Sequence, residues 1–103
     1  MLIQLKNALF EGRGNLIGDF IKNQDFEKAY QIAKRMNELF PNEDNIDALL
    51  ATTLVFQNKY DKALIIFNKI EDKTVISNTF AYFEEKQLSH KDFNKIRAYF
   101  KIN

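Results

Sequence analysis

The chain has 103 residues, 46% of them hydrophobic, and a formal net charge of +1. This length and composition predict one folded domain rather than a disordered chain, and the balanced charge argues against binding to nucleic acid or an anionic membrane. The absence of cysteine excludes disulfides and cysteine metal sites and fits a reducing, cytoplasmic compartment, and no apolar run approaches the roughly 20 residues that a membrane-spanning helix needs.

The first part of the chain has apolar residues at helical spacing. Leucines recur on one face of residues 2–10, which predicts an amphipathic helix. The same register continues through Gly12 to Phe20, so we favour one continuous or kinked helix to about residue 23. A break near residues 12–15, with Asn15 as the N-cap of a second helix, stays open.

Two helices are predicted in the middle of the chain. The first follows Asp25, which is placed to cap it, and ends at Pro41 because proline is poorly accommodated after helical residues. The second begins after Asn42 as its N-cap, carries acidic residues in its first turn, and runs to a polar turn at residues 57–59.

Three further helices are predicted in the remainder. One covers about residues 60–71, and the next runs from Val75 to about Gln87. Ser89 and Asp92 are spaced as a variant of the capping box and open the last helix.

An internal repeat organises the chain. The stretch that begins at Asp25 recurs at Lys59, with an aromatic residue, an acid, a lysine and an alanine in the same order. A repeat of about 34 residues is typical of stacked helical hairpins. The paired residues are Leu16 with Leu50, Phe20 with Leu54, Phe26 with Tyr60, Lys28 with Lys62, Ala29 with Ala63, Ile32 with Ile66 and Met36 with Ile70.

This pattern resembles the tetratricopeptide repeat family. One copy of its motif matches Leu16, Phe20, Phe26, Ala29, Ala33, Met36 and Pro41, and the next matches Leu50, Ala51, Leu54, Tyr60, Ala63, Phe67 and Ile70. A third copy is weaker, one residue short of the register and with isoleucine where alanine is expected; it places Phe80, Phe83, Phe93, Ile96 and Phe100.

The resemblance implies an all-α fold in which antiparallel helical hairpins stack as a short right-handed superhelix of about three repeats. Their expected bounds are residues 13–41, 47–74 and 76–102, after an N-terminal helical extension over residues 1–12. Alanine lets the second helix of each hairpin approach the first closely, and aromatic residues fill the wedge before the next hairpin.

The expected binding site is the concave groove, because the first helix of each hairpin lines it. The predicted groove residues are Gly14, Gly18, Ile21 and Lys22 from the first repeat, Ala48, Thr52, Val55 and Phe56 from the second, and Ala81 and Glu85 from the third. These side chains are mostly small or apolar, which favours the apolar face of an amphipathic helix over an acidic peptide end.

The resemblance therefore implies a non-enzymatic module that binds a protein or peptide partner. A narrower version is a small chaperone similar to the three-repeat proteins that shelter needle subunits in type III secretion. The alternative is a self-associating structural module, such as a homodimer, whose groove is filled by its own termini or by a second copy.

No residue cluster predicts catalysis, a cofactor or a metal site. The single histidine, His90, is expected to be a solvated residue in the first turn of the last helix. The acidic pairs at residues 43–44, 71–72 and 84–85 are expected to be solvated helix-end residues. The basic and aromatic residues of the last helix are likewise expected to form a solvated face rather than a nucleic-acid site.

Overall fold

The structure is a computed structural model that describes residues 15–102. The predicted helix at residues 2–10, the extension at residues 1–12, the choice between a continuous and a broken helix at residues 12–15, and Gly14 lie at least partly outside this part. Residues 15–22 are helical, and the helices that follow are α2 (Phe26–Leu39), α3 (Asp44–Phe56), α4 (Tyr60–Lys69), α5 (Thr74–Glu85) and α6 (Asp92–Phe100). No strand occurs between residues 15 and 102, which confirms the all-α prediction.

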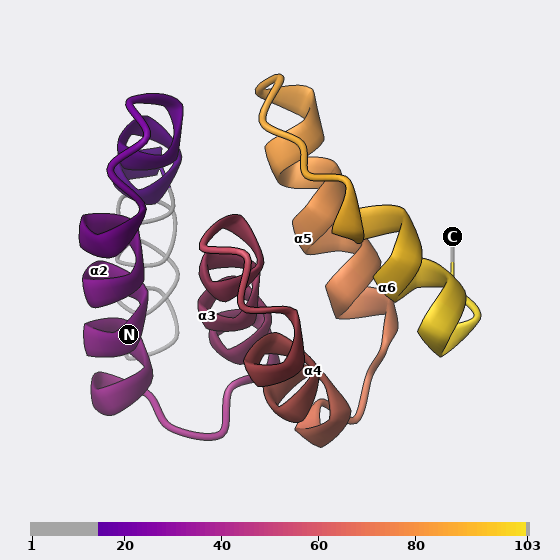
Figure 1. Ribbon diagram of the computed structural model, residues 1–103. Coiled ribbons are helices and arrows are strands. Elements are labelled where there is room, and N and C mark those ends of the chain that lie inside the picture. Colours follow the sequence, from indigo (N-terminus) through magenta and orange to yellow (C-terminus); the bar gives the residue numbers. More distant parts are fainter. Residues whose placement is uncertain (1–14, 103) are drawn as a thin grey trace.

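Consecutive helices form hairpins that stack around α3. Figure 1 shows α2 and residues 15–22 on one side of α3, and α5 and α6 on the other. Helix α3 packs against α2, α4 and α5, and all of its residues from Ala48 to Phe56 are buried. A helix that is buried all round must be apolar all round, and this explains the long apolar run in its sequence.

The first two hairpins close over alanine. Ala29 and Ala33 of α2, Ala51 of α3 and Ala63 of α4 are fully buried. Helix α3 packs closely along both α2 and α4, as helices do when small residues lie at their contact.

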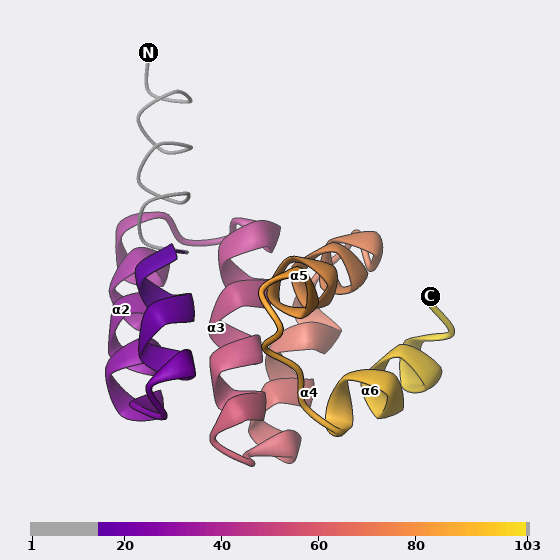
Figure 2. The same cartoon turned by 90° about the horizontal axis from the view of Figure 1, so that it is seen from above.

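The third hairpin closes over larger side chains. The backbones of α5 and α6 do not run close together, and the rings of Phe80 and Phe93 stack between them with their centroids 4.2 Å apart. Ile96, at the position where the repeat pattern expects alanine, is also fully buried. Figure 2 shows α6 set apart from α5 and joined to it by an extended segment.

Several predicted helix ends are wrong. Asn42 is not an N-cap: α3 begins at Asp44 after Glu43, and Asn42 instead has a left-handed backbone with a φ of 65°. Asp25 stands at the N-cap of α2 but makes no capping hydrogen bond, and its carboxylate lies 3.5 Å from the Lys28 amine. Helices α4 and α5 end about two residues earlier than predicted.

The capping box predicted for the last helix is not formed either. Helix α6 begins at Asp92 and has no side-chain cap from the residue that precedes it. The side chain of His90 takes this role, because its Nδ1 accepts a hydrogen bond from the Asp92 backbone N–H at 3.0 Å.

The helices are too short or too polar to cross a bilayer, as far as residues 15–102 are concerned.

Candidate functional site

The structure separates the predicted groove residues into two groups. Most are buried, and only three are exposed on the surface, while Gly14 lies outside the described residues. The buried ones are Gly18, Ile21, Ala48, Thr52, Val55 and Phe56, and the exposed ones are Lys22, Ala81 and Glu85. The expectation of an open apolar groove along α3 is therefore wrong for the residues that α3 supplies.

Side chains of α5 and of the turn after it cover the face of α3. The Tyr82 hydroxyl donates a hydrogen bond to Asn15 Oδ1 at 2.8 Å, which joins α5 to residues 15–22. A Cβ atom on Gly18 would lie 3.6 Å from Lys86 Cδ and 3.8 Å from Leu88 Cδ1. These are ordinary contact distances, so Gly18 lies directly against side chains of the turn after α5. The third hairpin therefore lies against the first, and the two enclose α3 between them.

The two buried threonines of α3 are compatible with this enclosure. Thr52 Oγ1 donates to the Ala48 carbonyl at 2.7 Å, and Thr53 Oγ1 donates to the Leu50 carbonyl at 2.6 Å. Both hydroxyls find a partner within their own helix, so their burial leaves no donor unsatisfied. Thr52 is a core residue rather than a residue offered to a partner.

The first helix of each hairpin ends in the same backbone motif. Gln24, Asn58 and Gln87 have left-handed backbones, with φ of 62°, 62° and 64°. The N–H of the next residue donates to the carbonyl five residues earlier, a helix-ending pattern in which glycine is the usual left-handed residue. These bonds are Asp25 to Phe20 at 2.7 Å, Lys59 to Leu54 at 2.9 Å and Leu88 to Phe83 at 2.9 Å.

The turn of the third hairpin is longer than the other two. Residues 23–25 and 57–59 separate the helices of the first two hairpins, whereas residues 86–91 separate α5 from α6. The additional residues fold back over the other turns. Leu88 reaches Gly18, and His90 reaches the turn between α3 and α4.

His90 is held by hydrogen bonds on both sides of its ring. Because the Asp92 N–H donates to Nδ1, Nδ1 carries no proton, and Nε2–H donates to Asn58 Oδ1 at 2.8 Å. The ring also meets Phe56 edge-on, with the centroids 5.9 Å apart. Burial lowers the pKa of His90, although the Asp92 carboxylate, 3.8 Å from Nδ1, acts in the opposite direction. The expectation of a solvated His90 is wrong.

A pocket of about 340 Å³ lies where the three turns meet. It contains two predicted groove residues that are buried, Ile21 and Phe56, and one that is exposed, Lys22. The full lining is Ile21, Lys22, Gln24, Phe26, Phe56, Asn58, Gln87, Leu88, Ser89 and His90. We call this the turn pocket. None of its lining side chains is a carboxylate, and its only permanent charge is the Lys22 ammonium.

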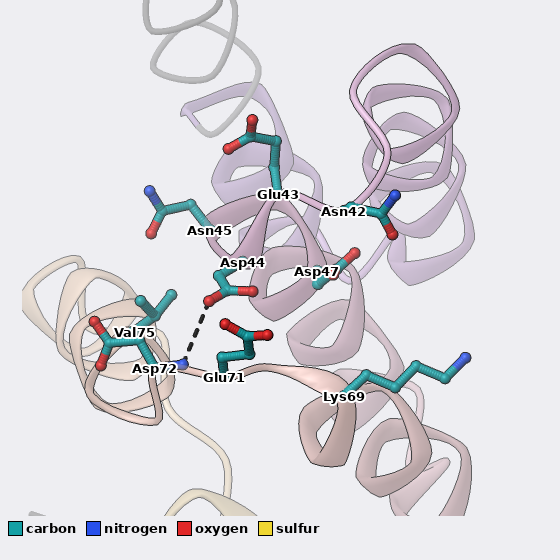
Figure 3. Close-up of a pocket in the computed structure, with 9 residues that line it drawn as sticks. All are labelled: Asn42, Glu43, Asp44, Asn45, Asp47, Lys69, Glu71, Asp72 and Val75. Atoms are coloured by element: carbon teal, nitrogen blue, oxygen red, sulfur yellow. Dashed lines mark hydrogen bonds between the residues drawn. The ribbon is translucent and has the colours of Figure 1, made fainter.

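A second pocket, of about 580 Å³, lies between the start of α3 and the link from α4 to α5 (Figure 3). Five carboxylates line it, from Glu43, Asp44, Asp47, Glu71 and Asp72. In the sequence they are two separate acidic pairs, at residues 43–44 and 71–72, and the single Asp47, and the fold brings them together. We call this the acidic pocket.

The acidic pocket is explained by the local structure. The residues at the start of α3 are favoured by the positive end of its helix dipole. The Asp72 backbone N–H donates to Asp44 Oδ2 at 3.4 Å (Figure 3), and Asn37 Nδ2 donates to Asp47 Oδ1 at 2.7 Å. Burial raises the pKa of Asp47 despite the bond from Asn37. No group of residues between 15 and 102 is arranged to hold a metal ion.

Comparison with known proteins settles the family. The tetratricopeptide repeat family model matches residues 20–75, which is more than half of the chain. The chain belongs to the tetratricopeptide repeat family. The match confirms the resemblance in the first two repeats. No similar curated protein and no similar solved structure was found.

Tetratricopeptide repeats generally mediate protein–protein interaction. In this tetratricopeptide repeat chain, the third hairpin lies beyond the matched residues except for the first two residues of α5. The long turn of that hairpin encloses α3 and completes the turn pocket, so the least typical part of the fold shapes the candidate site.

Proposed function

We propose that the chain is a non-enzymatic module that binds a peptide or an amphipathic helix of a partner protein. The contact surface consists of the turn pocket and of the exposed residues of the segment 15–22 and of α5, which we call the rim. The observation that carries the proposal is that all three hairpin turns converge on one pocket, since Gln24, Asn58 and Gln87 each line it. A partner that fills it contacts all three hairpins at once.

The exposed groove residues extend this surface. Lys22 borders the turn pocket, and Ala81 and Glu85 follow each other at helical spacing on the exposed face of α5. Side chains at such spacing suit contact with another helix. The surface is mixed in polarity, so a partner helix would place only part of an apolar face there. A small chaperone that protects one helical segment of a secreted subunit is a narrower form of this proposal.

Photo-crosslinking tests the proposal. A photoreactive phenylalanine analogue placed at Lys22 or at Ala81 should form adducts with the same partner in cells of the source organism. Lys34 of α2 is also exposed and provides the matched control. Adducts with a common partner from positions 22 and 81, but not 34, support the proposal. Equal adducts from all three positions, or none from positions 22 and 81, contradict it.

A second candidate function, self-association, is favoured by two exposed apolar side chains. Ile65 on α4 is 60% exposed and Tyr99 on α6 is 54% exposed. Both belong to the second helices of their hairpins, away from the turn pocket. A photoreactive residue at either position should then yield dimers of the chain, and Ile65→Lys should abolish concentration-dependent light scattering. A chain that stays monomeric at all concentrations removes this candidate.

A further inference from the structure

The turn pocket has the size and the walls of a receptor for one side chain. Cavities of about 150 Å³ in protein cores hold a benzene molecule, so about 340 Å³ is enough for an aromatic side chain with neighbouring backbone. Phe26 and Phe56 in its wall stack with their ring centroids 6.3 Å apart. Phe56 is only 6% exposed, so Phe26 and Leu88, which are half-buried, supply the apolar surface that a guest can reach. An aromatic guest gains edge or face contact with the Phe26 ring.

The polar groups around the pocket suit a peptide. Gln24, Asn58 and Gln87 each carry a side-chain amide, which can donate to a peptide carbonyl and accept from a peptide N–H. Neutral His90 is already bonded at both nitrogens, so it acts as a wall rather than as a charge.

The charge of the pocket selects the sign of the partner. The exposed ammonium of Lys22 meets no carboxylate among the other lining residues, whereas five carboxylates line the acidic pocket. An acidic residue beside the aromatic anchor would pair with Lys22, and a basic residue would be repelled.

We propose that the turn pocket binds a peptide segment of a partner that carries an aromatic side chain next to an aspartate or glutamate. The aromatic ring packs against the half-buried side chains of Phe26 and Leu88, and the adjacent carboxylate pairs with Lys22. This inference rests on the proposed function and specifies the partner at one site.

Selection from a phage library of random linear peptides on the whole chain tests it. The expected peptides share a phenylalanine, tyrosine or tryptophan beside an acidic residue. Lys22→Glu should weaken a selected peptide by at least about tenfold, equivalent to about 1.4 kcal/mol, and Ser89→Phe should abolish binding by filling the pocket from its exposed edge. The matched control Lys34→Glu makes the same charge change on α2 and should leave affinity unchanged.

The outcomes separate this inference from the proposed function. Peptides without an aromatic and acidic pair, or an affinity that survives both Lys22→Glu and Ser89→Phe, overturn the pocket. If the binding of such peptides is instead lost in the Ala81→Arg variant, the rim still binds partners and only the assignment of the turn pocket is wrong. No enrichment on the folded wild-type chain also overturns the pocket, while the crosslinking test continues to decide the proposed function. Circular dichroism checks that each variant remains folded.

Discussion

The hairpin of α3 and α4 closes over alanine, whereas the hairpin of α5 and α6 closes over phenylalanine and isoleucine. In the former, Ala51 and Ala63 are fully buried and the helices run close together. In the latter, Phe80 and Phe93 stack between helices that stay apart, and Arg97 joins Glu84 at 2.6 Å across the gap. Larger contact residues require a wider hairpin, and a wider hairpin requires a longer turn. That longer turn supplies Leu88 and His90 to the turn pocket.

The largest expected effect comes from exchanging the residue at the shared alanine position. Ile96→Ala should leave a cavity between α5 and α6 and lower the free energy of unfolding by about 2–5 kcal/mol, because Ile96 is fully buried. The reverse change, Ala63→Ile, should overpack the second hairpin and cost about 1–3 kcal/mol. Urea denaturation measures both. If Ile96→Ala were neutral, the third hairpin would close like the second, and the contrast would be wrong.

Lys73 connects the two kinds of hairpin and should give the next largest effect. Its amine donates to the Phe67, Asn68 and Ile70 carbonyls at the end of α4, and lies 5.0 Å from the centroid of the Phe100 ring of α6. Hydrogen bonds from a charged donor are worth about 1.5–3 kcal/mol, so Lys73→Met should lower the free energy of unfolding by about 2 kcal/mol.

Lys69→Met is the control, because Lys69 is exposed in the last turn of the same helix. If the two variants lost the same free energy of unfolding, the lysines would act only through the helix dipole, and the hydrogen bonds from Lys73 to the three carbonyls would contribute nothing.

His90 ties the long turn to the second hairpin, and this connection should depend on pH. His90→Ala removes two hydrogen bonds, each worth about 0.5–1.5 kcal/mol net. Because burial lowers the pKa of His90 in the folded state, folding favours the neutral ring. Its contribution is therefore complete above the unfolded pKa of about 6.5 and decreases as the pH falls through that value and then through the folded pKa.

The measurement is the free energy of unfolding at several pH values between about 7.5 and 5, above the range where most carboxylates titrate. The wild type should lose stability on acidification and His90→Ala should not, since His90 is the only histidine in the chain. The same slope in both proteins would mean that the ring does not hold the turn.

The sequence predicts the first two hairpins well because their contacts are local and repeated. The alanine and aromatic positions recur in one register, and that register determines where neighbouring helices meet. The covering of α3 could not be read in this way. It depends on Tyr82, Lys86 and Leu88 reaching residues 15–22, and the distance between two helices separated by a third is not encoded in either of them.

The turns were missed for a different reason. A left-handed residue at a helix end is usually glycine, and this chain uses Gln24, Asn58 and Gln87. The length of the third turn is also not visible in the repeat. When the third copy is aligned on Phe93 and Phe100, it is only one residue shorter than the other copies. Helix α5 ends early, at Glu85, but the added turn residues make up for this, so the total length of the copy changes little.

The smallest expected effect comes from glycine substitutions that compare the short turn of the first hairpin with the long turn of the third. Gln24→Gly and Gln87→Gly should each stabilise the fold by less than about 1 kcal/mol, because glycine adopts the left-handed conformation without the steric cost of a Cβ atom but loses more backbone entropy on folding. In the short turn, the bonds at Asp25 hold the chain tightly, so Gln24→Gly should give the full gain. In the long turn, glycine also loosens the approach of Leu88 to Gly18, so Gln87→Gly should give less. Thermal unfolding of the two variants compares them directly. A larger gain at Gln87 would indicate that the long turn is strained by its left-handed residue rather than anchored through Leu88 and His90.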